Sequence, residues 1–133
     1  MDIPAAVKAL NLPAGAFAVF GSGPMAVRGL RTIDEIHVIV PENLFKQLEK
    51  DPSWKQGVLA DHHKSLQMGN VNIYESWAPG SWDMSELIRN ADTINGVPYV
   101  QLESVREWKE LRGLPKDEED IKLIDRYLAS KTK

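Results

Sequence analysis

The sequence predicts an α/β (α+β-like) fold, a small mixed β-sheet with helices packed on it and two helices at the C-terminal end. Short, apolar, β-prone stretches alternate with stretches whose apolar residues recur at helical spacing. No internal repeat or low-complexity segment interrupts this alternation. The chain has 133 residues, of which 43% are hydrophobic, so it can bury one core without disulfides or metals. We therefore expect a single domain over residues 1–133.

The N-terminal half is expected to alternate helices and strands. Pro13 and Gly15 follow a helical apolar pattern and end the first helix before an apolar run. A short helix is expected after the glycine-rich turn that follows this run. Pro41 suits the first turn of the next long helix, because its missing N–H is not needed there. The expected helices lie near 3–10 and 41–50, and the expected strands span 17–20 and 35–40.

The middle of the chain has weaker signals. Asp83 and Glu86 have the spacing of a capping box, which predicts the start of a helix. Asn95-Gly96 is a turn signal ahead of a β-prone run. Strands are expected over 56–60, 71–75 and 97–100, with a loop or a short helix over the polar stretch 61–69.

Two helices are expected in the last third. Ser104 and Glu107 have the spacing of a capping box for the first helix, and Gly113 is a natural stop for it. Pro115 separates it from the second helix, whose first turn is acidic over 117–120 and so suits the helix dipole. The apolar faces are expected to comprise Val105, Trp108 and Leu111 in the first helix and Ile121, Ile124, Tyr127 and Leu128 in the second.

Composition excludes several kinds of chemistry and partner. The chain has no cysteine, which removes disulfides, thiolate zinc sites and cysteine nucleophiles. The formal net charge is −3, so polymeric nucleic acid is disfavoured as a partner. The first residues lack a basic region followed by a long apolar core, and the longest apolar run, near 14–20, is too short to span a bilayer. We therefore expect a cytoplasmic protein without a membrane partner.

The glycine-rich turn Gly21-Ser22-Gly23 is the most informative segment. Backbone N–H groups at a helix start, together with the Ser22 hydroxyl, would form an anion cradle for which phosphate is the natural guest. The alternative is a tight strand-to-helix turn that needs glycine for its shape. Arg28 and Arg31 follow closely and would either clamp phosphate oxygens or serve as surface charge. Ser22→Ala with Gly23→Val is expected to weaken phosphate binding without unfolding the domain.

Further basic and aromatic residues offer two interpretations each. Lys109, Arg112 and Lys116 could supply a second cationic side to a nucleotide site, although a solvated helix face is the favoured interpretation. Trp77 and Trp82 flank a Pro-Gly turn, where they could stack on a nucleobase or pack the loop onto the core.

Other site types find little support in the sequence. His62 and His63 are adjacent, which is poor geometry for one metal, so we interpret them as loop residues. The turn at 21–23 lacks the Gly-Lys-Ser/Thr ending of a P-loop, the third glycine of a dinucleotide site and the Gly-x-Ser-x-Gly elbow of hydrolases.

The motifs taken together resemble the small nucleotidyltransferases of the DNA polymerase beta superfamily, over about residues 15–130. The resemblance lies in the Gly21-Ser22 turn, the Arg-Gly-x-Arg segment at 28–31, the acidic-apolar-x-apolar strand after it, and the Lys-Asp-x-x-Asp-Ile sequence at 116–121. It implies the nucleotidyltransferase fold, with strands 17–20, 35–40 and 71–75 as neighbours in one sheet. It also implies Mg²⁺ as cofactor and transfer of a nucleoside monophosphate from an NTP to a hydroxyl or phosphate acceptor.

The resemblance assigns the catalytic positions to Glu35, His37 and Asn72. In that family an Asp-x-Asp pair on one strand and a third carboxylate on a later strand bind magnesium, since residues two apart on a strand share a face. Here only Glu35 keeps a carboxylate, which leaves it as the single acidic metal ligand.

Two functional hypotheses follow from this departure. The first is an active nucleotidyltransferase in which Gly21, Ser22 and Gly23 hold the phosphates and Arg28 and Arg31 offset their charge. The second is a catalytically degenerate module of the same fold that binds a nucleotide, another phosphate-bearing small molecule or a protein partner, similar to antitoxin-like members of the superfamily. Dependence of NTP binding on Mg²⁺ separates the two.

Overall fold

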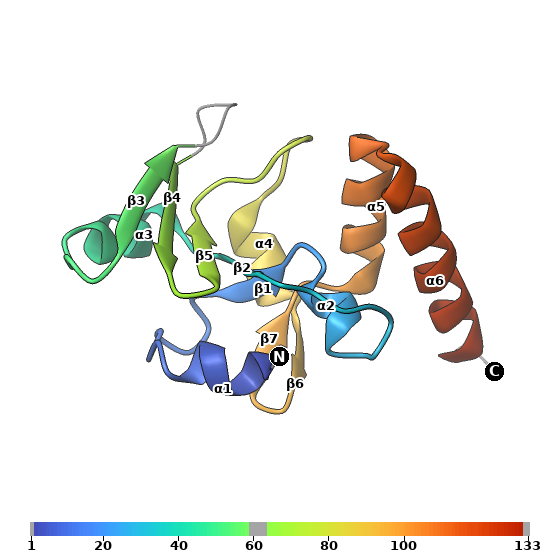
Figure 1. The fold of residues 1–133 in the computed structure, drawn as a ribbon, viewed down its shortest axis with the longest axis horizontal. Coiled ribbons are helices and arrows are strands. Elements are labelled where there is room, and N and C mark those ends of the chain that lie inside the picture. The colour runs from blue at the N-terminus through green and yellow to red at the C-terminus, as the bar shows by residue number, and fades with distance from the viewer. Residues whose placement is uncertain (1, 59–63, 132–133) are drawn as a thin grey trace.

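The computed structural model describes residues 2–58 and 64–131, which form one seven-stranded mixed sheet and six helices (Figure 1). The mixed α/β class and the two C-terminal helices agree with the sequence prediction. The strands are β1 (Ala18–Phe20), β2 (Ile36–Ile39), β3 (Lys55–Val58), β4 (Lys64–Met68), β5 (Val71–Tyr74), β6 (Asp92–Ile94) and β7 (Val97–Tyr99). The helices are α1 (Ile3–Lys8), α2 (Gly23–Ala26), α3 (Glu42–Glu49), α4 (Met84–Arg89), α5 (Leu102–Arg112) and α6 (Pro115–Lys131).

The strand order is β3-β4-β5-β2-β1-β7-β6. Strand β2 pairs antiparallel with β1 and parallel with β5, so the three strands expected to be neighbours are neighbours. In this register Phe20 lies opposite His37, and His37 lies opposite Asn72. The central strands therefore bring three distant segments of the chain to one place.

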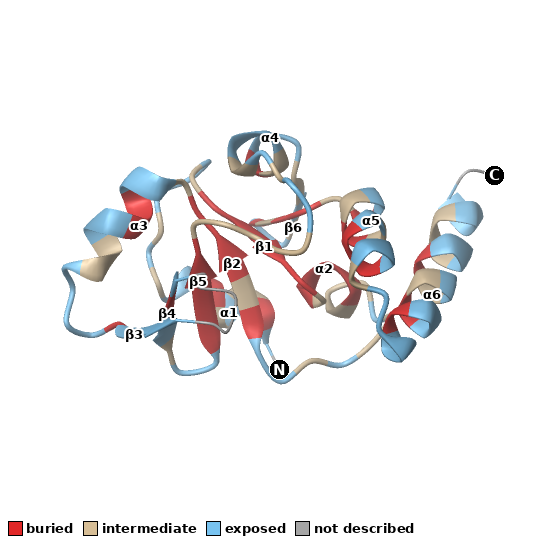
Figure 2. Ribbon diagram, turned by 90° about the horizontal axis from the view of Figure 1, so that it is seen from above, coloured by how far each residue is buried: buried red, intermediate tan, exposed pale blue. Residues whose placement is uncertain are grey.

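Each face of the sheet has its own hydrophobic core, and β2 contributes to both. Ile36 and Val38 join the cluster packed against α1 and α3, whereas Ile39 joins the cluster packed against α4, α5 and α6. The same alternation of side chains places Val19 in the first cluster and Phe20 in the second. Figure 2 shows these strands as a mostly buried layer and α6 with much of its outer surface exposed.

Several local predictions are confirmed. Pro41 precedes α3, and the Asp83 carboxylate accepts a hydrogen bond from the Glu86 N–H at the start of α4. Asn95 and Gly96, both with positive φ, form the turn of the β6–β7 hairpin. Strand β6 itself lacked a signal in the sequence, because its short Asp-Thr-Ile run is polar at its first two positions.

Three expectations about a loop, a helix cap and an apolar helix face were wrong. The stretch 61–69 is not a loop or helix where it is described, because Lys64–Met68 is strand β4, with Ser65 and Leu66 buried between neighbouring strands. Helix α5 begins at Leu102 after Gln101, so Ser104 lies inside it and caps nothing. Leu111 is 54% exposed and does not belong to the apolar face of α5. His62 and His63 lie outside the described residues.

Among residues 2–58 and 64–131, none of the helices combines the length and the apolar character needed to cross a membrane.

Helix α2 packs closely on β1 through Gly23. A Cβ atom on Gly23 would lie 2.3 Å from Cγ1 of the fully buried Val19. The expectation that Gly23→Val leaves the fold intact is therefore wrong, because a valine side chain has no room at this position. Gly23 is required for packing, whatever else the turn does.

Gly23→Ala should lower the free energy of unfolding by about 1–3 kcal/mol, because the added methyl group overpacks against Val19. Urea denaturation monitored by tryptophan fluorescence measures this change. Gly57→Ala on the exposed strand β3 is the matched control, since its Cβ meets only the Ser65 hydroxyl oxygen at 3.1 Å. We expect the control to stay within about 0.5 kcal/mol of the natural chain. Equal stability of both variants would contradict the packing argument.

Candidate functional site

Strands β2 and β5 place His37 and Asn72 side by side on one face of the sheet. Their neighbours along each strand point to the other face, into the core beneath α1 and α3. Glu35, one residue before β2, completes the group: its Oε2 lies 3.4 Å from His37 Nε2 and 3.3 Å from Asn72 Nδ2. The three residues assigned to the catalytic positions are thus brought together, and we call them the Glu35–His37–Asn72 cluster.

His37 is partly buried among aromatic rings. Its ring centroid lies 5.6 Å from that of Tyr74 and 5.9 Å from that of Trp77. Burial lowers the pKa of His37 below its usual value, the Glu35 carboxylate acts in the opposite direction, and the positive charge of Arg112 adds to the lowering. The imidazole is therefore neutral at neutral pH. A neutral ring that donates Nε2–H to Glu35 keeps Nδ1 as a proton acceptor.

The Nδ1 atom of His37 faces the glycine-rich turn. Gly21 adopts a φ of +65°, and a Cβ on it would lie 3.0 Å from His37 Nδ1. Glycine is therefore needed here both for the backbone conformation and for the approach of the imidazole. The turn and the Glu35–His37–Asn72 cluster form one continuous site.

Ser22 occupies the N-cap position of α2 without capping it. Its side chain makes no capping hydrogen bond, and its Oγ instead lies 3.1 Å from Lys109 Nζ of α5. Helix α2 has only four residues, Pro24 has no N–H, and the N–H groups of Met25 and Ala26 donate to the Ser22 carbonyl. Anion binding at this turn therefore depends more on side chains than on the helix N-terminus.

A buried group of charges lies behind Ser22. Lys109 is fully buried, with its Nζ 2.9 Å from Asp120 Oδ2 and 3.8 Å from Asp117 Oδ1. Burial lowers the pKa of Lys109, and hydrogen bonding to Asp120 opposes that change. Arg31 pairs with Asp120 at 2.5 Å, and Arg112 makes two hydrogen bonds to Asp117. We call these five residues the Lys109 cluster; three cations and two carboxylates leave it with a formal charge of +1.

The favoured sequence interpretation of these basic residues was wrong for Lys109, which is not on a solvated face. Lys116 is exposed, as that interpretation expects, and Arg112 is partly buried. The sequence contained a pattern that indicates burial of Lys109. Lys109 lies four residues after Val105 and seven after Leu102, so it shares a helix face with these two buried residues. A lysine in register with the apolar residues of a helix faces the core and requires buried partners.

The two arginines predicted to clamp phosphate have protein partners. Arg28 donates to the Pro24 carbonyl at 2.8 Å and to Asp92 of β6 at 3.1 Å, which joins α2 to the β6–β7 hairpin. Arg31 reaches the site only indirectly, through Asp120 of the Lys109 cluster. A phosphate role for either guanidinium stays a prediction.

Aromatic side chains form the wall between the sheet and α5. Trp77 stacks on Phe20 with ring centroids 4.6 Å apart and lies 5.2 Å from Trp108. The Arg112 guanidinium covers Trp108 at 4.3 Å, and the Trp82 indole N–H donates to the Pro79 carbonyl. These contacts support the interpretation that the loop tryptophans pack onto the core. Base stacking stays a prediction.

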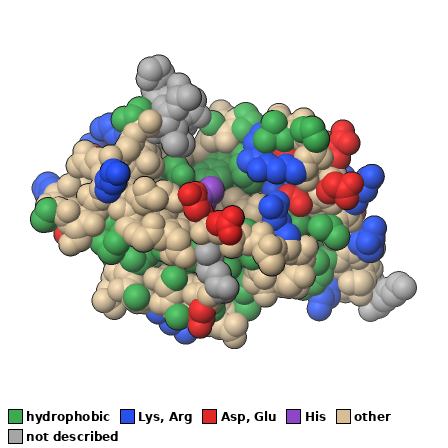
Figure 3. Space-filling view, viewed as in Figure 1, with side chains coloured by type: hydrophobic (Ala, Val, Ile, Leu, Met, Phe, Trp, Pro, Cys, Tyr) green, Lys and Arg blue, Asp and Glu red, His purple; other side chains and the backbone are tan. Residues whose placement is uncertain are grey.

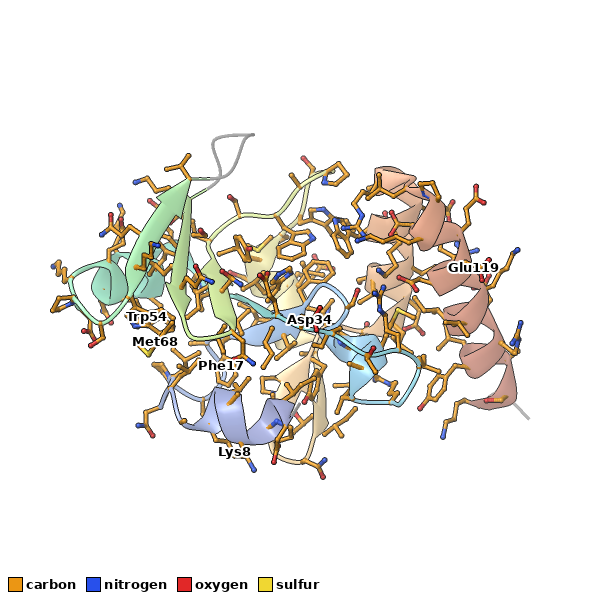
Figure 4. All side chains as sticks on the ribbon, in the orientation of Figure 1. Lys8, Phe17, Asp34, Trp54, Met68 and Glu119 are labelled. Atoms are coloured by element: carbon orange, nitrogen blue, oxygen red, sulfur yellow. The ribbon has the colours of Figure 1, made fainter. Side chains whose placement is uncertain are left out.

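The site opens on one side of the molecule. Figure 3 shows a hollow there, with hydrophobic side chains and a histidine at its floor, basic side chains beside it and acidic ones below. In Figure 4, side chains fill the space between the central strands, near the labelled Asp34, and α5. Glu35, rather than the adjacent Asp34, contacts His37 and Asn72.

The donor set does not suit a two-magnesium site. The Glu35–His37–Asn72 cluster offers one carboxylate, one imidazole and one amide, whereas Mg²⁺ prefers carboxylate and water oxygens. Within the described ranges, no group of three or more His, Cys, Asp or Glu side chains could hold a metal ion. The cluster therefore supplies one carboxylate where paired Mg²⁺ ions would need several.

Comparisons of the chain with protein-family models, with curated proteins and with solved structures give no match.

Asp117→Asn should lower the free energy of unfolding by about 3 kcal/mol at pH 7, because it leaves buried cations without their carboxylate. Burial by itself would raise the pKa of Asp117, but hydrogen bonds from Arg112 and the Leu114 N–H, with the charges of Arg112 and Lys109, hold it below its usual value. The stabilisation is therefore complete above the unfolded pKa of about 3.9 and is lost as the pH falls through the lower folded value.

Denaturation between pH 7 and pH 2 tests this. The free energy of unfolding of the natural chain should fall steeply below about pH 4. That of Asp117→Asn should fall less steeply over the same pH range. Glu118→Gln, in the same turn but exposed, is the matched control and should behave as the natural chain. The same dependence of the free energy of unfolding on pH in all three proteins would contradict the electrostatic role of Asp117.

Proposed function

We propose that this chain is a nucleotidyltransferase-like domain that binds an NTP, or another small molecule with a comparable phosphate group, in the hollow between β2, the turn 21–23 and α5. The observation that carries the proposal is the position of Ser22. Its hydroxyl lies at the glycine-rich turn and accepts a hydrogen bond from buried Lys109, and the preceding residue, Gly21, packs against His37. Hydroxyl groups next to excess positive charge are suited to phosphate oxygens.

The order of the elements supports the nucleotidyltransferase-like part of the proposal. The turn 21–23 joins β1 to a short helix, β2 returns antiparallel beside β1, and β5 lies parallel to β2 with Asn72 opposite His37. In the nucleotidyltransferases that the motifs resemble, the positions matching Glu35, His37 and Asn72 would carry three carboxylates, and this strand arrangement would bring them together. Imidazole and amide replace two of them, so we propose that ligand binding here does not depend on magnesium.

A second candidate function is nucleotidyl transfer itself, favoured by the contact between Glu35 and His37. In this reaction the acceptor oxygen attacks the α-phosphorus, the bond from that phosphorus to the bridging oxygen breaks, and pyrophosphate leaves. The acceptor proton would pass to His37 Nδ1, which Glu35 leaves available by accepting from Nε2. Intact mass spectrometry of candidate acceptors after incubation with ATP tests this candidate.

His37→Gln should abolish any such mass shift, because glutamine cannot accept the proton, while ATP binding should persist. Transfer that survives in His37→Gln would contradict the role given to His37. ATP binding by the natural chain that strictly requires Mg²⁺ would contradict the proposal of magnesium-independent binding.

The natural chain should bind ATP with similar affinity in Mg²⁺ and in EDTA, as measured by isothermal titration calorimetry. His37→Asp with Asn72→Asp should create a three-carboxylate site, because both positions share the sheet face that Glu35 contacts. We expect Mg²⁺ to tighten ATP binding to this double variant by about tenfold.

The matched control is Asp34→Asn, which removes an exposed carboxylate that lies next to Glu35 in the chain but outside the cluster. It should bind ATP as the natural chain does. If neither the natural chain nor the double variant binds ATP, with or without Mg²⁺, the proposed function is wrong and only the fold stands.

A further inference from the structure

Lys109 defines the hydrogen-bonding role of Ser22. An ammonium group has three N–H donors and no acceptor, so Lys109 must donate to both Ser22 Oγ at 3.1 Å and Asp120 Oδ2 at 2.9 Å. A hydroxyl can donate one hydrogen bond and accept others. Because Ser22 accepts from Lys109, its own proton is available for a different partner.

Ser22 is also released from the usual task of a residue in its position. A serine at the start of a helix ordinarily accepts a hydrogen bond from a backbone N–H of the first turn, and Ser22 makes no such bond. Ser22 as a residue is partly exposed, whereas Lys109 is fully buried. A bound ligand therefore has access to Ser22 but not to Lys109.

The orientation of Lys109 is fixed by two carboxylates of α6. Asp120 and Asp117 attract its ammonium, and Arg31 and Arg112 hold these two carboxylates in place. Movement of Nζ away from Ser22 would separate buried charges, which is costly in a low dielectric. The direction in which Lys109 donates is thus built into the packing of α5 against α6.

We infer that Lys109 is a positioning residue for the bound phosphate group: it holds Ser22 as an acceptor, so that the Ser22 hydroxyl donates its proton to a phosphate oxygen of the ligand. This inference rests on the proposed function. It also explains how the site would prefer a ligand whose oxygens accept hydrogen bonds. A ligand group that only donates hydrogen bonds would find no acceptor in a hydroxyl oriented in this way.

A double-mutant cycle tests the inference, with inorganic tripolyphosphate in EDTA as the probe and calorimetry as the measurement. Ser22→Ala and Lys109→Met should each raise the Kd for tripolyphosphate by about tenfold, the loss of one hydrogen bond to a charged group. Since both changes remove the same oriented donor, the double variant should also lose about tenfold rather than about a hundredfold.

The control is Lys116→Met, which removes the same charge from an exposed position of α6. It should keep the Kd of the natural chain. Thermal unfolding is recorded for each protein, and we expect Lys109→Met to be less stable and Ser22→Ala to be close to the natural chain. A merely structural Lys109 would lower stability without the coupling to Ser22.

The outcomes separate this inference from the proposed function. Losses that multiply in the double variant, or a Lys109→Met variant that binds normally, would overturn the inference alone. A natural chain that binds neither tripolyphosphate nor ATP would overturn both.

A second measurement covers the case in which Lys109→Met does not fold. In the natural chain labelled with ¹⁵N-lysine, the buried Lys109 ammonium should give an NMR signal that shifts when tripolyphosphate is added. The Lys116 signal should stay unchanged, and Ser22→Ala should remove most of the Lys109 shift. Binding of tripolyphosphate without a shift at Lys109 would contradict the inference.

Discussion

The two-residue period of β2 is the constraint on which both the core and the candidate site depend. This strand has a hydrogen-bonded neighbour on each side, so its register with β1 and β5 is fixed from both directions. Ile36 and Val38 enter one core, and His37 between them faces the hollow. A slip of one residue would bury the imidazole and expose the two aliphatic side chains. The stability of the sheet thus maintains the geometry of the site.

The second determinant is the burial of charge between α5 and α6. Taking Lys109 and two aspartates out of water costs free energy that only close pairing can offset. Apolar residues of similar size could hold the helices together with less demand on geometry. The charges instead impose one relative orientation on the two helices, because Lys109, Arg112 and Arg31 must all meet Asp117 or Asp120. That orientation brings α5 within reach of Ser22.

Local patterns predicted the fold wherever the chemistry of a residue matched its environment. The apolar runs at β1, β2 and β5, the turn at Asn95-Gly96 and the helix start at Asp83 were all found in this way. Strand β4 was not predicted because polar and apolar residues do not alternate regularly along it. Its extended conformation depends on pairing with β3 and β5. Glu35, His37 and Asn72 were grouped by resemblance. Lys109 was missed because its charge suggested solvent, whereas its buried environment depends on carboxylates in a different helix.

The residues of the candidate site are synthesised at very different times. Ser22 and Lys109 are 87 positions apart in the chain, and Arg31 and Asp120 are 89 apart. A nascent chain that has emerged only as far as β7 can pair all seven strands, yet it holds neither Lys109 nor the carboxylates that neutralise it. On the ribosome the sheet can therefore form well before the proposed phosphate site is complete. Until α6 emerges, a newly made molecule could have a folded sheet but would lack the carboxylates that hold Lys109 against Ser22.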